Sequence, residues 1–76
     1  MAVLLSELVA GQRGRVVSVD ARAEVGQRIM EMGVTPGTTL QMVGAAPMGD
    51  PLAYEVRGYR LSLRRAEAAL VEVDRL

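Results

Sequence analysis

The chain contains no cysteine, histidine, lysine, phenylalanine or tryptophan among its 76 residues. Without cysteine, no disulfide can supplement the hydrophobic core, and nothing argues for an oxidising compartment. The absence of histidine and cysteine removes the commonest general base, the thiol nucleophile, and the imidazole and thiolate ligands of transition metals. Aromatic side chains carry much of the contact area in many binding surfaces. Since only two tyrosines are present, any binding surface must be mostly aliphatic.

The remaining residue types offer little for catalysis or metal binding. No serine or threonine is accompanied by a histidine base, and the glycines form neither of the common nucleotide-binding patterns. Met30 and Met32 fall within a helical pattern and Met42 within a strand pattern, so we interpret these methionines as gap-filling core residues. We therefore predict a protein that is not an enzyme and that needs neither a cofactor nor a bound metal.

The charges are balanced and spread along the chain. Nine basic and nine acidic residues give a net charge of zero, which supplies no long-range attraction to nucleic acid or anionic lipid. Arg64-Arg65 is the only adjacent basic pair, and no row of aromatics is available to stack on bases. No apolar run approaches the roughly 20 residues of a membrane span, and the opening stretch MAVLLSELVAG has no basic start and is interrupted by Glu7. We expect a cytoplasmic protein that neither binds nucleic acid nor inserts directly into a membrane.

Hydrophobic periodicity divides residues 1–76 into the elements of one small domain. A helix is predicted at 21–32, ended by Gly33, with shorter helical turns at 6–8 and 64–69. Five short strands with one helix inserted after the first predict a mainly β fold, a small and partly open β-barrel. The predicted strands are 15–20, 39–43, 52–57, 59–63 and 70–74.

The same periodicity predicts which side chains face the core. On the helix, Val25, Ile29 and Met32 recur at the spacing of one stripe. On the strands, alternate positions are apolar, and both tyrosines fall on inward positions. The predicted core consists of Val17 or Val19, Val25, Ile29, Met32, Leu40, Met42, Tyr54, Val56, Leu61, Leu63, Val71 and Val73.

Residues 46–51 read APMGDP, a stretch that is stiffer than an ordinary connection between strands. Its two prolines fix their own φ angles, Gly49 admits a positive φ, and Asp50 can accept a hydrogen bond from nearby backbone. One interpretation is a rigid turn that sets the register of two strands. The other is a recognition loop, because a rigid loop loses little entropy on binding and would present Met48 to a partner. The two interpretations are compatible.

Four segments read together, RIMEMGVTPGTTLQMV, AAPMGDP, VRGYRLSLRRAEA and VEV, resemble the FeoA family of small accessory proteins in bacterial ferrous iron uptake. The similarity extends over nearly the whole chain, and the order and spacing of the motifs make it specific. The resemblance implies an SH3-like barrel and a partner, the ferrous permease FeoB, contacted through its cytoplasmic GTPase portion. The positions that match the family pattern are Gly33, Pro36, Gly37, Pro47, Gly49, Asp50, Pro51, Arg57 and Gly58.

Three functions are compatible with these observations. We favour a regulator or assembly factor of the permease, with Met48, Asp50 and Met30 as candidate partner contacts and the other matched positions setting the shape. The alternative is a generic SH3-like peptide-binding or regulatory module, since a similar module forms the C-terminal domain of DtxR-type repressors. A ferrous iron carrier is disfavoured by the lack of histidine and cysteine. A weak homo-oligomer is compatible with any of the three.

Overall fold

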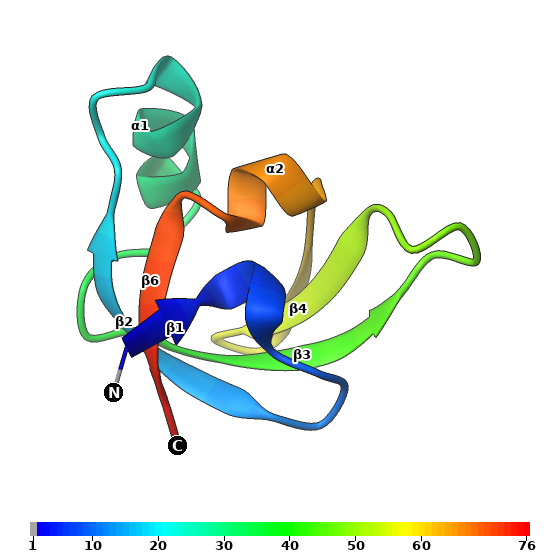
Figure 1. The fold of residues 1–76 in the computed structure, drawn as a ribbon. Coiled ribbons are helices and arrows are strands. Elements are labelled where there is room, and N and C mark those ends of the chain that lie inside the picture. The colour runs from blue at the N-terminus through cyan, green and yellow to red at the C-terminus, as the bar shows by residue number, and fades with distance from the viewer. Residues whose placement is uncertain (1) are drawn as a thin grey trace.

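The computed structural model describes residues 2–76 as six strands, the helix α1 and two shorter helical segments. Helix α1 (Glu24–Glu31) lies between β2 and β3, the 3₁₀ turn η1 (Leu5–Glu7) follows β1, and α2 (Arg65–Ala68) precedes β6 (Figure 1). The strands are β1 (Ala2–Leu4), β2 (Arg13–Val19), β3 (Thr39–Ala45), β4 (Leu52–Val56), β5 (Tyr59–Leu63) and β6 (Val71–Arg75).

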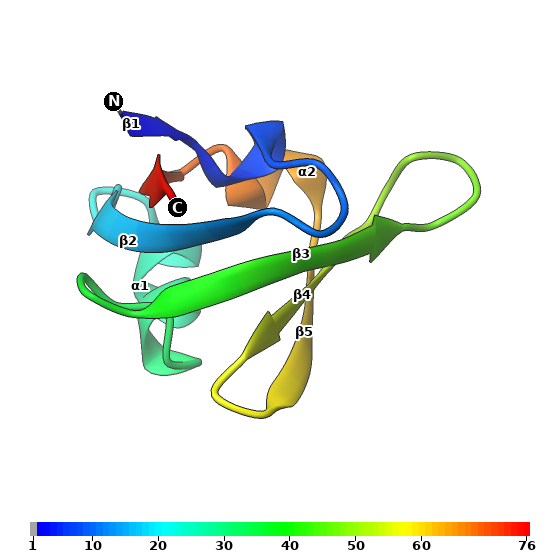
Figure 2. The same cartoon turned by 90° about the horizontal axis from the view of Figure 1, so that it is seen from below.

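All six strands form one antiparallel sheet in the order β1-β6-β2-β3-β4-β5. The sheet curls on itself, with β3 running across the molecule between β2 and the β4–β5 hairpin (Figure 2). This arrangement confirms the predicted partly open barrel and the single helix after the first predicted strand. The predicted count of five strands was wrong, because β1 was missed. It is only three residues long and pairs with β6 at the other end of the chain, so the neighbouring sequence does not indicate a strand there.

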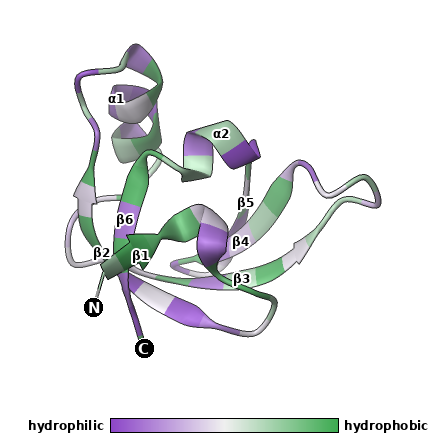
Figure 3. Cartoon of the chain, in the orientation of Figure 1, coloured by the Kyte–Doolittle hydropathy of each residue, from purple (hydrophilic) through white to green (hydrophobic). Residues whose placement is uncertain are grey.

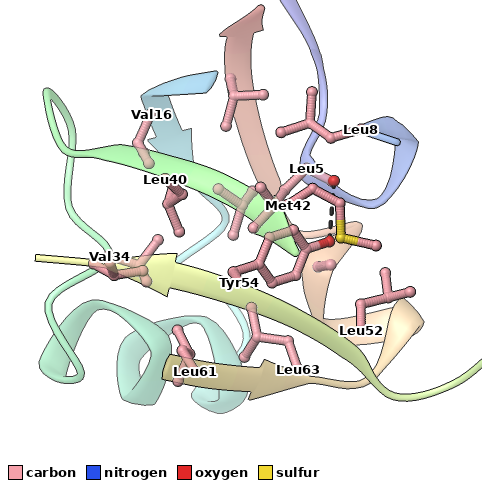
Figure 4. Close-up of a cluster of buried hydrophobic side chains, with 14 of the residues drawn as sticks. Leu5, Leu8, Val16, Val34, Leu40, Met42, Leu52, Tyr54, Leu61 and Leu63 are labelled. Carbon is pink, nitrogen blue, oxygen red and sulfur yellow. Dashed lines mark hydrogen bonds between the residues drawn. The ribbon is translucent and has the colours of Figure 1, made fainter. Parts of the chain in front are cut away.

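One cluster of buried side chains fills the barrel (Figure 4). Tyr54 lies at its centre, and its hydroxyl donates a hydrogen bond to the backbone carbonyl of Leu5 at 3.1 Å. The alternation of hydrophobic and hydrophilic residues that buries one face of each element is visible along β6 and around α1 (Figure 3). The buried hydrophobic residues are Leu5, Leu8, Val16, Ile29, Val34, Leu40, Met42, Leu52, Tyr54, Val56, Leu61, Leu63, Ala68, Val71 and Val73.

A β-bulge changes the predicted core of β2. The pairing of β2 with β6 shifts register between Val16 and Ser18, so Val17 is the extra residue of a bulge. Val17 is therefore 41% exposed, and Val16 takes the inward position. Val19 packs against the edge of the core. Of the two predicted alternatives, Val19 therefore contacts the core and Val17 does not, because the residue inserted at the bulge interrupts the alternation of inward and outward side chains.

Helix α1 begins at Glu24, later than predicted, because the preceding residues form a turn of their own. The carboxylate of Asp20 accepts hydrogen bonds from the backbone N–H of Arg22 at 3.2 Å and from its guanidinium at 3.0 and 3.1 Å. The guanidinium holds the pKa of the Asp20 carboxyl below its usual value. Gly26 lies so close to this turn that a Cβ there would be 2.0 Å from the Asp20 carbonyl oxygen. Gly26 therefore permits a close contact between helix and turn.

The end of α1 explains why Met32 is not in the core. Met32 follows the last helical residue and is 41% exposed. Gly33 then takes a φ of 102°, which turns the chain back so that Val34 occupies the buried position. Tyr59, also predicted to face inward, is exposed instead and donates a hydrogen bond from its hydroxyl to the Met32 carbonyl. The predicted burial of Met32 and Tyr59 was thus wrong: Val34 takes the core position expected of Met32, and Tyr59 contacts the end of the helix instead of the core.

Candidate functional site

The loop of residues 46–51 is closed by its own backbone. The Ala46 N–H donates to the Pro51 carbonyl at 3.0 Å, and the Gly49 N–H donates to the Ala46 carbonyl at 2.7 Å. The second bond defines a β-turn with Pro47 at its second position, where proline is favoured, and Gly49 has a φ of 87°. The Asp50–Pro51 peptide bond is cis. The loop is therefore a defined turn at the tip of the β3–β4 hairpin.

Arg65, at the start of α2, ties this loop to the barrel. Its backbone N–H donates to Asp50 Oδ1 at 2.9 Å, and its Nη2 donates to the Gly49 carbonyl at 3.0 Å. Its Nη1 lies 3.5 Å from the carbonyl oxygen of Ser6 in η1. One arginine thus joins three segments that are far apart in the sequence. The prediction that Asp50 accepts a backbone hydrogen bond is confirmed, although the donor lies outside the loop.

Met48 occupies the tip of the loop and is 93% exposed. The loop itself projects away from the body of the barrel (Figures 1 and 2). Leu52, at the exit of the loop, is fully buried. Single exposed apolar side chains are common on protein surfaces, but this one stands on a turn that is held at both its tip and its base. The turn therefore holds the backbone of Met48 and leaves its apolar side chain exposed.

Met30 is not part of the same surface. It lies on α1, which is at the far end of the molecule from the loop in both views (Figures 1 and 2). Its side chain is half-buried, not fully exposed. The structure therefore brings Met48 and Asp50 together and keeps Met30 apart from them.

The other matched positions shape two turns and the end of α1. Gly37 has a φ of 92° and donates its N–H to the Val16 carbonyl at 2.8 Å, just after Pro36 in the turn that leads into β3. Arg57 and Gly58 form the two-residue turn of the β4–β5 hairpin, with φ angles of 49° and 86°.

Arg57 has a second role in joining these turns. Its Nη2 donates to Thr38 Oγ1 at 3.2 Å, and the same hydroxyl lies 3.3 Å from the Gly33 carbonyl and 3.1 Å from Thr35 Oγ1. Thr38 is buried beneath these contacts. Arg57 therefore links the β4–β5 turn to the segment that follows α1, which supports the shape-setting interpretation of this position.

A groove between α1 and the free edge of β5 was not predicted. Its volume is about 400 Å³. Apolar side chains and charged residues both line it, because the barrel covers only part of the apolar stripe of α1 and leaves the border of that stripe exposed beside charged residues. The lining residues are Val25, Arg28, Ile29, Glu31, Met32, Ser62, Leu63 and Glu67. Sequence reasoning missed this site because α1 and β5 are brought together only by the fold.

Two negative observations apply to residues 2–76. Their aspartate and glutamate side chains form no cluster of three or more that could hold a metal ion. None of the helices in this part of the chain combines the length and apolar character needed to span a bilayer.

Comparison with known proteins places these features in a family. Residues 3–75 match the family of the FeoA domain. A relative from Porphyromonas gingivalis, described as an Fe(2+) transport protein A/Fe(2+) transporter FeoB fusion protein, is 43% identical over 70 residues. The match covers 92% of this chain and 8% of the fusion protein, so the chain corresponds to a small part of that relative.

Solved structures give the same result. A FeoA-like protein from Clostridium acetobutylicum superimposes with a TM-score of 0.92 at 39% identity, covering 99% of this chain and 87% of the other. FeoA from Stenotrophomonas maltophilia, solved with zinc and described as a prokaryotic SH3 domain protein, gives a TM-score of 0.84 at 36% identity, covering 95% and 89%. A manganese-dependent transcriptional repressor superimposes with a TM-score of 0.88 at 14% identity, covering 99% of this chain and 41% of the repressor chain. At this level of identity the match shows a shared fold alone. The barrel is SH3-like, and the chain belongs to the FeoA family.

Proposed function

We propose that this chain is a cytoplasmic accessory protein of ferrous iron uptake that acts by binding a FeoB-type permease. The observation that carries the proposal is the relative in which FeoA and FeoB are parts of one polypeptide. Fusion gives two domains a high effective concentration for each other. Association of the two domains without a covalent link would require a binding surface on the FeoA domain itself.

The part of the permease that we propose as the target is its cytoplasmic GTPase portion. An accessory protein can act there through binding, by favouring one conformation of the permease or by promoting its assembly. The absence of histidine and cysteine fits a regulator or assembly factor better than a carrier that must hold ferrous iron in transit.

For the contact surface we propose the tip of the loop, with Met48 as the apolar anchor. Methionine is enriched in protein interfaces, and a side chain held on a rigid turn loses little backbone entropy when it binds. Asp50 is exposed beside it and uses Oδ1 to hold the loop, so we propose a supporting role for this residue. We no longer place Met30 in the contact, because it lies at the opposite end of the molecule.

Copurification with the permease tests this function. The tagged chain would be incubated with detergent-solubilised membranes that contain the FeoB permease of the same organism, and bound permease would be quantified by mass spectrometry. We expect specific recovery of the permease by the parent chain and reduced recovery by a Met48→Asp variant. Recovery of other proteins without the permease would favour the generic SH3-like module. Stoichiometric ferrous iron on the chain without bound permease would favour the carrier.

A further inference from the structure

Strand β5 has an unpaired edge. Among the strands of residues 2–76 it is the last of the sheet and pairs with β4 alone, whereas the opposite end of the sheet is formed by β1. A free strand edge presents backbone N–H and C=O groups that can pair with another chain. Proteins often cover such an edge with a helix or loop, and here α1 lies alongside β5. The groove between them shows that this cover is incomplete.

The hairpin register identifies which backbone groups are free. Val56 and Tyr59 flank the two-residue turn and therefore form a hydrogen-bonded pair. Pairs in an antiparallel ladder alternate, so Arg60 and Ser62 lie in the non-hydrogen-bonded pairs opposite Glu55 and Ala53. The N–H and C=O groups of Arg60 and Ser62 consequently point away from β4, toward the free edge.

The groove beside this edge supplies an apolar floor. Leu63 of β5 and Ile29 of α1 are buried at its base, and Val25 and Met32 line its side. The groove has a volume of about 400 Å³, which is enough for a few side chains but not for a whole helix.

Charged side chains of both signs border the same groove. Arg28 and Glu31 come from α1 and are exposed, and Glu67 comes from α2. Within residues 2–76 the ion pair formed is that of Arg22 with Asp20. The charges of Arg28 and Glu31 therefore remain available to a partner that crosses the groove.

We propose that β5 and this groove bind an extended peptide segment of a partner protein by β-augmentation. The segment adds a strand to β5 through the backbone groups of Arg60 and Ser62 and places alternate apolar side chains against Val25 and Met32, the apolar lining residues that remain accessible. Backbone pairing supplies affinity in this mode, and the pocket for alternate side chains supplies specificity. This site is separate from the Met48 loop, and the inference does not depend on the identity of the permease as the partner.

The test uses a library of random 12-residue peptides displayed on phage and selected against the parent chain. Selected peptides would be synthesised with a fluorophore, their dissociation constants measured by anisotropy, and their contacts mapped by shifts of the backbone amide resonances. Two variants separate the edge from the groove. Ser62→Pro removes an outward N–H without removing a bond to β4, and proline is tolerated at such edge positions. Met32→Glu places a charge in the groove.

Ser62→Ala is the matched control, because it changes the side chain and keeps the N–H. We expect selected peptides to have alternating apolar residues and to cause shifts centred on Arg60 and Ser62. Binding should be at least tenfold weaker to Ser62→Pro and to Met32→Glu, with a much smaller loss for Ser62→Ala than for Ser62→Pro. Thermal melting checks that each variant is folded. If Ser62→Pro does not fold, Met32→Glu still tests the proposal. Any of three results would overturn the proposal. The library could yield no binder, or the selected peptides could bind folded Ser62→Pro or Met32→Glu as tightly as the parent. The chain could also form a dimer through β5 in place of peptide binding.

Discussion

Asp50 accepts a hydrogen bond from the backbone N–H of Arg65 at 2.9 Å, so a residue of the β3–β4 loop caps the first turn of α2. The interaction connects two segments of the chain that approach each other only in the folded state. It acts as a helix cap supplied from a distance, and it fixes the base of the turn that carries Met48.

Replacing Asp50 by alanine should lower the free energy of unfolding by about 0.5–2 kcal/mol, the usual cost of losing a helix N-cap. Asp50→Asn is the matched control, because its amide oxygen can still accept the Arg65 N–H. Urea unfolding of the three proteins measures the difference. Equal stability of Asp50→Ala and the parent would mean that this bond does not hold the loop.

Gly49→Val should destabilise the fold by about 1–3 kcal/mol, because a β-branched residue is strained at the φ of 87° found there. Gly44→Ala is the control. Gly44 lies in β3, its φ is not in the left-handed region, and an added Cβ would meet nothing within 4 Å. The midpoint of thermal unfolding should fall for Gly49→Val and stay near the parent value for Gly44→Ala. A similar midpoint for both variants would contradict the assigned turn.

Stability should fall at alkaline pH through Tyr54. Burial raises the pKa of its phenol from 10.0 to about 12, with the charge of Arg65 acting in the opposite direction. The unfolded phenol loses its proton first, so the stabilisation is complete below about pH 10 and is lost as the pH rises toward 12. Two pKa units correspond to about 2–3 kcal/mol.

Tyr54→Phe provides the comparison for this pH dependence. It should cost about 1 kcal/mol at neutral pH, because the Leu5 carbonyl loses its partner, and it should remove most of the alkaline decline. Urea unfolding between pH 8 and pH 11.5 measures both effects. Parallel declines of parent and variant would show that other groups cause the loss.

Ferrous iron should bind weakly, because carboxylates and thioethers are the side-chain ligands available. Anaerobic isothermal titration is expected to show no site tighter than the high micromolar range. Stoichiometric binding at sub-micromolar concentrations would instead support the carrier hypothesis and remove the main argument for a regulator.

The parts of the fold that the sequence predicted correctly depend on local chemistry. Pro47 and Gly49 specify a turn by their own backbone preferences, and the burial of Tyr54 and Val56 follows from the alternation of β4. The end of α1 was also predictable, because Gly33 adopts the left-handed conformation expected after a helix.

The parts that were missed depend on contacts between distant segments. The bulge at Val17 arises from pairing with β6, and the exposure of Met32 depends on Val34 taking its place in the core. The contact of Arg65 with Asp50 and the groove beside β5 likewise require the folded chain. The spacing of hydrophobic residues along the sequence carries no information on such contacts.

The central claim is that Met48 is a contact residue for the permease. Met48→Asp should keep the fold, since substitutions at exposed positions usually change stability by less than about 0.5 kcal/mol. It should nevertheless weaken the interaction, because a hydrated charge replaces an apolar contact. Val9→Asp is the matched control. Val9 is 60% exposed and lies between η1 and β2, outside any strand.

The most direct measurement is radioactive ferrous iron uptake in cells that keep the permease but lack their own copy of this chain. Each variant is supplied on a plasmid, with its amount in the cell checked by immunoblot. We predict that the parent and Val9→Asp restore uptake and that Met48→Asp, at equal abundance, does not. Full restoration of uptake by folded Met48→Asp would contradict the claim and leave the loop with a structural role alone.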